Sequence, residues 1–282
     1  MGVAVVGGGP AGLATAGALH QRGIGSRVLE AGSSVGTSWR NHYDRLHLHT
    51  VRSLSALPGR PIPREMGRWV ARGDLLRYLE DYAREQALEV ETGIEVTRVD
   101  RRDRGWLLRT SGGDRAAVAV VIATGYNRSP ILPAWPGRKD FEGQVIHSSR
   151  YRNPGPFTGK QVLVVGSGNS GAEIAADLVD GGASEVLISI RTPPNIQRRE
   201  FLGIPTQVLG ILLGGLPARA VDSISLLLQK VALRPPSLRV GPARQGRLQP
   251  DLPGRADPAH RRRLPRPPEA APDRGRRRGG GF

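Results

Sequence analysis

The stretch that decides the fold reads VAVVGGGPAGLATAGALH, from Val3 to His20. Its apolar start, Val3–Val6, predicts a short strand, the glycines that follow predict a turn, and residues 11–21 predict a helix. Ser26–Glu30 predicts the next strand. Strand, glycine turn, helix and strand in this order form a βαβ unit, which indicates an α/β fold built on parallel strands.

The turn from Gly7 to Gly12 satisfies the GxGxxG pattern of dinucleotide-binding units. Gly7 permits the tight turn, Gly9 lets backbone N–H groups approach a pyrophosphate, and Gly12 allows close packing of helix on strand. Pro10 and Ala11 begin the helix, whose amino terminus attracts phosphate.

Glu30 ends the second strand, 23 residues after Gly7, where a carboxylate accepts hydrogen bonds from an adenosine ribose. A glycine-rich turn without a ligand is the alternative.

The same unit is repeated 159 residues later. A strand at 161–165, a helix at about 170–179 and a strand at 185–190 surround a second glycine turn. That turn comprises Gly166, Ser167, Gly168, Asn169, Ser170 and Gly171. Arg191 follows the second strand in place of an acid. An arginine pairs with a 2′-phosphate that a carboxylate repels, so this unit is expected to prefer NADPH to NADH. A solvated surface arginine is the alternative.

Two unlike dinucleotide sites in one chain predict electron transfer between FAD at the first and NADPH at the second. The fold class is α/β, with two dinucleotide-binding (Rossmann-like) βαβ domains. We expect an FAD domain at 1–150, an NADPH domain at 151–233 and a disordered basic tail at 234–282.

Between these units, residues 31–72 are expected to be irregular. A helix capped by Asp74 is expected to run to about Gln86, and residues 89–123 to form short strands. Residues 207–213 and 218–233 predict two further helices.

Composition narrows the function classes. The chain has no cysteine, which excludes disulfides, thiolate zinc sites and a redox CxxC pair. The net charge of +16 is concentrated in residues 234–282, which carry 13 arginines against four acidic residues. Phe282 is the only aromatic residue there and no nucleic-acid motif accompanies it, so no nucleic-acid partner is expected. No membrane span or secretory signal is expected, and a cytoplasmic location is the default.

Phe141 to Tyr151 matches FxGxxxHxxxY. With this motif the sequence resembles the flavin-containing monooxygenase family, and the similarity covers roughly residues 3–232. The stretch from Tyr43 to His49 looks most like plant YUCCA-type members and their bacterial relatives, whereas related Baeyer-Villiger enzymes carry Trp in place of Tyr151. The resemblance implies further cofactor contacts at Trp39, Arg40, His49, Val96, Ala123, Thr124 and Gly125.

The resemblance also implies the reaction. NADPH reduces FAD, the reduced flavin captures O2 as a C4a-hydroperoxide, and one oxygen atom passes to a small-molecule substrate. No residue is expected to be catalytic, and His147 is as readily structural as chemical. No metal is expected, since His47 and His49 lack further ligands at zinc-like spacing. Two other functions remain open, a flavin reductase or NADPH oxidase and an inactive cofactor-binding fragment. A homodimeric state also remains open.

Residues 234–282 depart from the family pattern, because Arg, Pro, Gly and Ala make up 35 of these 49 residues. The codons of these four residues begin with two G or C bases, and an excess of such residues is what GC-rich DNA gives when it is read out of frame. We therefore hypothesise a reading-frame shift near Leu233 that leaves the FAD domain without its closing segment. A natural basic linker or interaction tail is the alternative. Reading the DNA after Leu233 in the other two frames distinguishes them.

Overall fold

The computed structural model of the chain describes residues 2–127, 129–191, 199–201, 203–215 and 217. Met1–Lys230 forms one compact unit and Val231–Phe282 is grouped separately. The predicted helix at 218–233 and the predicted disordered tail at 234–282 lie outside the described residues. The division into domains at residue 150 stays a prediction.

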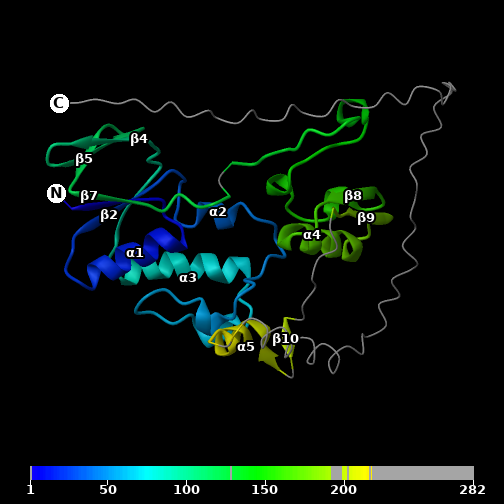
Figure 1. Cartoon of the computed structure of the whole chain (residues 1–282), viewed down its shortest axis with the longest axis horizontal. Helices are drawn as coiled ribbons and strands as arrows, with labels where there is room; N and C mark the ends of the chain where they lie inside the picture. The colour runs from blue at the N-terminus through cyan, green and yellow to red at the C-terminus, as the bar shows by residue number, and fades with distance from the viewer. Residues whose placement is uncertain (1, 128, 192–198, 202, 216, 218–282) are drawn as a thin grey trace, which may run out of the picture. The chain divides into compact units, whose positions relative to one another are not determined.

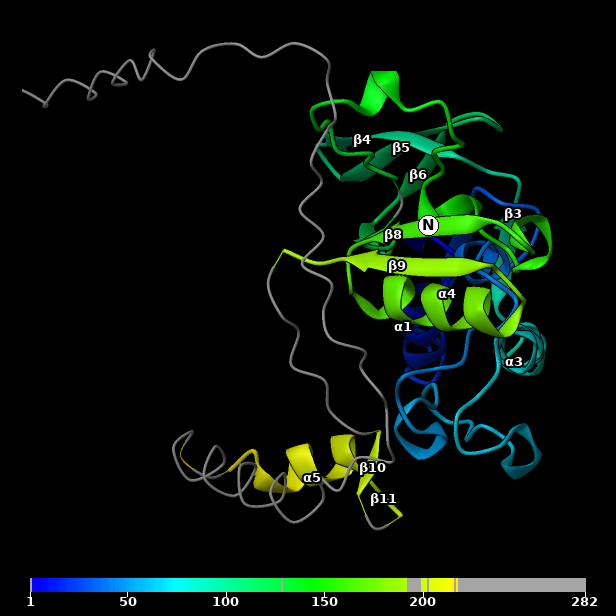
Figure 2. The same ribbon diagram turned by 90° about the vertical axis from the view of Figure 1, so that its right-hand side faces the viewer.

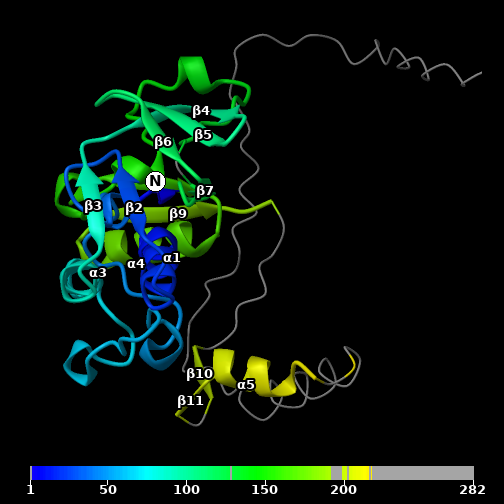
Figure 3. The same ribbon diagram turned by 90° about the vertical axis from the view of Figure 1, so that its left-hand side faces the viewer.

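A four-stranded parallel sheet, ordered β3-β2-β1-β7, forms the centre of the first βαβ unit. Its strands are β1 (Val3–Val6), β2 (Ser26–Glu30), β3 (Glu89–Thr92) and β7 (Ala119–Ile122). Val5 on β1 lies opposite Val28 on β2 and Val121 on β7, and Figure 3 shows β2 and β3 beside each other. Val5 and Val28 are fully buried, as expected for the inner strands of a parallel sheet. The predicted strands Val3–Val6 and Ser26–Glu30 are confirmed.

Helix α1 (Pro10–His20) connects β1 to β2, and α3 (Arg72–Glu85) runs beside it (Figure 1). A Cβ on Gly17 of α1 would lie 2.0 Å from the Tyr82 hydroxyl on α3. Only a residue without a side chain therefore lets the two helices approach this closely. The prediction that Asp74 caps α3 is wrong. The helix begins three residues earlier, at Arg72 after the N-cap Ala71, so Asp74 lies in its first turn and pairs with Arg77 instead.

The segment between β2 and α3 is irregular, as predicted. It contains only α2 (Thr37–Arg40) and the short 3-10 turns η1 (Arg52–Leu54) and η2 (Arg64–Met66). Within this segment His47 makes an isolated antiparallel bridge to Ala71.

A three-stranded antiparallel sheet follows β3, with β4 (Val96–Arg102), β5 (Gly105–Thr110) and β6 (Arg115–Ala117). Strand β6 ends at Ala117, and after Val118 the chain continues as β7, which joins the parallel sheet. After β7, the chain makes the 3-10 turns η3 (Arg138–Asp140), η4 (Ser148–Arg150) and η5 (Gly155–Phe157).

The second βαβ unit pairs β8 (Gln161–Val165) with β9 (Glu185–Ser189) in parallel, and α4 (Asn169–Asp180) packs along both strands (Figure 2). Ile174 and Leu178 are the buried apolar residues of this helix that join a core cluster. Strand β9 ends one residue before the predicted Ile190. Beyond it lie the short strands β10 (Glu200–Phe201) and β11 (Ile204–Pro205) and the predicted helix α5 (Thr206–Leu213). The predicted fold class, two Rossmann-like βαβ units in an α/β chain, is confirmed. Among the helices that the structure describes, none is long and apolar enough to cross a membrane.

Candidate cofactor-binding site

The first glycine turn is held by the strands on either side of it. Gly7 has a φ of 110° and its N–H donates to Leu29 O at 2.8 Å. A Cβ on Gly7 would lie 2.4 Å from Ala123 O, and a Cβ on Gly12 would lie 1.9 Å from Gly7 O. Both positions therefore require glycine for packing, and Gly7 requires it for its backbone conformation as well, whether or not a ligand is bound.

Gly9 is different, because a Cβ placed on it meets nothing within 4 Å. It caps α1 in an extended conformation, and Pro10 and the exposed Ala11 open the helix behind it. Unpaired backbone N–H groups at a helix amino terminus attract phosphate. The open surface over Gly9 is therefore a cradle that a side chain would fill and that fits the pyrophosphate of FAD.

Glu30 is tied to the turn itself. Its two carboxylate oxygens accept backbone N–H groups from Gly8 at 2.6 Å and from Gly32 at 2.8 Å. Sequence reasoning missed this structural role, which fixes the glycine turn against the loop after β2. Each oxygen keeps a second lone pair, so the expected ribose contact stays a prediction.

The second glycine turn reproduces the first. Gly166 has a φ of 101° and donates to Ser189 O at 2.9 Å, and a Cβ on Gly171 would lie 2.1 Å from Gly166 O. A Cβ on Gly168 meets nothing within 4 Å. Ser167 follows Gly166 in the turn, and Asn169 and Ser170 begin α4. This turn presents the same kind of open cradle.

Arg191 lies two residues beyond β9, and it is exposed. Among the residues that the structure describes, none forms an ion pair or hydrogen bond with its side chain. Its guanidinium is thus accessible to an anion, and the 2′-phosphate contact stays a prediction.

The ATG segment lies next to the first turn. The N–H of Ala123 donates to Val6 O at 2.8 Å, directly before Gly7. Thr124 and Gly125 follow on the surface. Val96 begins β4, and its side chain packs against the cluster that contains Leu108.

Three other predicted contact residues carry protein partners. Arg40 pairs with Glu80 at 2.5 Å and donates to Ser34 Oγ at 3.1 Å. Trp39 is half-buried, with its ring centroid 5.8 Å from that of His42. The Nε2 atom of His49 lies 3.2 Å from a carboxylate oxygen of Glu173 on α4. These pairings hold the segment after β2, and the flavin contacts expected there stay predictions.

The last residue of the FxGxxxHxxxY motif, Tyr151, contacts α4. The Tyr151 hydroxyl is buried and donates to Asp177 at 2.7 Å, and the Tyr43 hydroxyl donates to Glu173 at 2.7 Å. Burial, with the hydrogen bond to the carboxylate second, raises the pKa of both tyrosines. The Nδ1 atom of His147 accepts the N–H of Ser149 at 3.1 Å and caps η4, which is a structural role.

Arg45 completes this contact by pairing with Asp180 and lying 3.7 Å from Asp177. Sequence reasoning missed the acidic side of α4, formed by Glu173, Asp177 and Asp180. The sequence signal that could have revealed it is the spacing of these three acidic residues, which places them on one face of the helix. The tyrosines and the arginine lie opposite this face. The set anchors the helix that follows the second glycine turn to the segment that follows α2.

A family model described as pyridine nucleotide-disulphide oxidoreductase matches residues 4–200. Together with the two dinucleotide-binding folds, this match defines the class of protein, an oxidoreductase linked to pyridine nucleotides. The chain belongs to the flavin-containing monooxygenase family.

Relatives within this family are similar over most of the chain. Indole-3-pyruvate monooxygenase YUCCA1 of Oryza sativa subsp. japonica is 36% identical over 230 residues, 80% of this chain and 56% of that protein. YUCCA6 of Arabidopsis thaliana is 37% identical over 82% of this chain and 58% of that protein. A variant of the flavin monooxygenase from Stenotrophomonas maltophilia superposes with a TM-score of 0.69 at 31% identity, over 79% of this chain and 67% of that chain. This chain therefore spans little more than half the length of the plant relatives.

Proposed function

We propose that this chain is the cofactor-binding part of an FAD-dependent, NADPH-consuming monooxygenase that transfers one oxygen atom from O2 to a small organic substrate. One observation carries the proposal. Two glycine turns of the same geometry, both open at the middle glycine, are followed by different residues, Glu30 in the first unit and Arg191 in the second.

The chain's own residues bind and orient. The turn at Gly9 receives the pyrophosphate of FAD and the turn at Gly168 that of NADPH, so residues 1–150 and 151–233 divide the two cofactors between them. Bound flavin supplies hydride acceptance and the reaction with O2. OTEMO, whose structure holds FAD and NADP, superposes with a TM-score of 0.56 at 27% identity, over 68% of this chain and 39% of that chain.

Arg191 is the reason to propose NADPH rather than NADH as the cofactor. A guanidinium pairs well with the 2′-phosphate of NADPH, and that of Arg191 has no partner among the described residues. The substitutions in the Stenotrophomonas maltophilia variant introduce an arginine followed by a threonine. The same dipeptide stands at residues 191 and 192 of this chain, shortly after β9 ends at Ser189.

The test compares two cradles with a control. Gly9→Asp places a carboxylate where the FAD pyrophosphate sits and abolishes flavin binding. Gly168→Asp leaves flavin bound and removes its reduction by NADPH. Gly73→Asp adds the same group on α3, where a Cβ also meets nothing within 4 Å, and it leaves both properties intact.

Flavin content is measured by absorbance of the purified protein, and reduction is measured by stopped-flow mixing with NADPH. Equal loss of flavin in the Gly9 and Gly168 variants would show that the two sites are assigned wrongly. Release of hydrogen peroxide without any oxygenated product, over a panel of amines, sulfides and ketones, would replace the monooxygenase by an NADPH oxidase.

A further inference from the structure

The hydroxyl of Tyr43 contacts the start of helix α4, where the second glycine turn ends. It donates to Glu173 at 2.7 Å, and the Ser170 side chain forms a hydrogen bond to the same hydroxyl. Ser170 belongs to the glycine turn, and Glu173 follows three residues later in α4. Because residues three apart share a helix face, both contacts hold the same side of the helix. The Tyr43 hydroxyl therefore ties the turn proposed to receive NADPH to the segment after α2.

Glu173 is held at both of its carboxylate oxygens. One oxygen accepts the Tyr43 hydroxyl, while the other lies 3.2 Å from Nε2 of His49 and 3.3 Å from the Arg199 guanidinium. Only 21% of the Glu173 side chain is exposed. Rotating the carboxylate would break contacts on both sides, so the acceptor that Tyr43 uses has a fixed orientation.

The ring of Tyr43 continues this connection toward the first unit. The residue is 2% exposed and lies in the core cluster that contains Leu178 of α4. The ring centroid of His42 is 6.2 Å from that of Tyr43, and the Trp39 ring lies 5.8 Å beyond His42. Trp39 packs against this cluster and also against the cluster that contains Leu13 of α1. A row of packed side chains therefore runs from the helix of the first glycine turn to the helix of the second.

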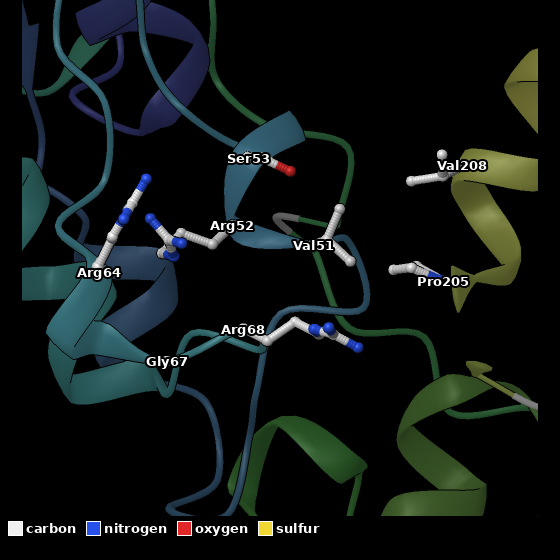
Figure 4. Close-up of a pocket in the computed structure, with 8 residues that line it drawn as sticks. All are labelled: Val51, Arg52, Ser53, Arg64, Gly67, Arg68, Pro205 and Val208. Atoms are coloured by element: carbon white, nitrogen blue, oxygen red, sulfur yellow. The ribbon is translucent and has the colours of Figure 1, made fainter. Parts of the chain in front are cut away.

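The far end of the same segment is held less tightly. The Val51 N–H donates to the side chain of Gln207 at 3.2 Å. The Val51 side chain, however, faces Pro205 and Val208 across a cleft of about 320 Å³ (Figure 4). The walls of an open cleft can shift, whereas a close-packed core resists displacement. The contact that fixes the second turn is therefore the one at Tyr43.

We infer that Tyr43 is a positioning residue for hydride transfer from NADPH to FAD, acting through Ser170 and Glu173 on the second glycine turn. The inference rests on the proposed function. In this step NADPH gives up a hydride, with both electrons of its C–H bond, to the oxidised flavin, and NADP⁺ and the reduced flavin anion FADH⁻ result. The reacting atoms must lie within about 3–3.5 Å of one another. A small displacement of one turn therefore slows the transfer while each cofactor keeps its own contacts.

Tyr43→Phe tests the inference, because it removes the hydroxyl and keeps the buried ring. Stopped-flow mixing of the flavin-loaded full chain with a series of NADPH concentrations separates the limiting rate constant of reduction from the dissociation constant of NADPH. The limiting rate constant is expected to fall about tenfold or more. Flavin content and the dissociation constant are expected to stay close to those of the parent protein.

Tyr78→Phe is the matched control. Tyr78 is fully buried, and its hydroxyl accepts the Leu57 N–H at 2.8 Å and donates to Arg60 O at 2.7 Å. The variant loses a donated and an accepted hydrogen bond, as Tyr43→Phe does, but both bonds lie within the first unit. It is expected to lose stability and to keep the limiting rate constant of the parent protein.

Amide hydrogen exchange gives a second readout that needs no cofactor. The Ala172 N–H donates to Gly168 O at 3.0 Å and reports on the start of α4. In Tyr43→Phe, the α4 amides from Ala172 onward are expected to exchange about ten- to a hundredfold faster, the range for a lost hydrogen bond to a charged group. Tyr78→Phe is expected to leave their exchange unchanged.

Three results would each overturn the inference alone: an unchanged limiting rate constant in Tyr43→Phe, an equal fall in Tyr78→Phe, or unchanged exchange in α4. A parent chain that binds no flavin, or whose flavin is not reduced by NADPH, would overturn the proposed function and this inference with it. That outcome is visible before any variant is compared, so the two failures are distinguishable.

Discussion

Gly9 and Gly12 lie in one motif, but the structure gives them opposite consequences when alanine replaces them. A Cβ on Gly12 would lie 1.9 Å from Gly7 O, whereas Cβ atoms essentially never approach closer than 3.0 Å. The difference means that α1 and the turn must separate by at least 1.1 Å. A Cβ on Gly9 meets nothing within 4 Å, and the residue has an extended backbone that alanine adopts readily.

The expected cost for Gly12→Ala is set by overpacking against a backbone carbonyl, which cannot rotate away. Overpacking costs about 1–3 kcal/mol, or more where the obstacle is rigid. The better helix propensity of alanine offsets at most about 1 kcal/mol of this. A net loss of about 2 kcal/mol lowers the melting temperature of a chain of this size by about 4–8 °C. Gly9→Ala costs about 0.5–1 kcal/mol, because alanine is a poorer N-cap than glycine.

Thermal unfolding of the flavin-free proteins by circular dichroism separates the two variants, and absorbance after reconstitution reports their flavin content. Gly9→Ala is expected to unfold about 1–4 °C below the parent protein and to lose flavin affinity, whereas Gly12→Ala unfolds about 4–8 °C below it. Gly168→Ala and Gly171→Ala repeat the comparison in the second turn, where the obstructed Cβ lies 2.1 Å from Gly166 O. If Gly9→Ala lowers the melting temperature as much as Gly12→Ala, the division between packing glycine and cradle glycine is refuted.

Further changes test other contacts. Arg191→Ala is expected to weaken NADPH by about 1–3 kcal/mol and to leave NADH unchanged in stopped-flow reduction; an unaltered preference moves the 2′-phosphate contact elsewhere. Tyr151→Phe removes the buried hydrogen bond to Asp177 and is expected to lower the free energy of unfolding by about 1.5–3 kcal/mol in urea denaturation, and no loss would show that water replaces the hydroxyl. Burial, with Arg152 and Arg72 adding to it, lowers the pKa of His42 from its ordinary 6.5. The contribution of neutral His42 to stability is therefore complete above pH 6.5 and is lost as the pH falls below 6.5. The acid-dependent loss of unfolding free energy should be smaller in His42→Gln than in the parent protein. Identical pH profiles of the two proteins would contradict this.

Local sequence determined the two βαβ units. Apolar runs at Val3–Val6 and Gln161–Val165, each followed by a glycine turn and a helix, predicted strands with the bounds that the structure has. Periodicity and glycine spacing act within a few residues, so they can be recognised without knowing the fold. Boundaries that depend on capping were less certain, as the start of α3 at Arg72 shows.

Only the tertiary structure decided which charged groups meet. Tyr43 and Glu173 are 130 residues apart, and Arg40 reaches Glu80 from a different element. The carboxylate of Glu30 accepts hydrogen bonds from the backbone N–H groups of Gly8 and Gly32, which no spacing rule predicts. Whether a charge finds a partner depends on the segments that folding brings beside it, and that information lies in the packing of the whole unit rather than in any local pattern.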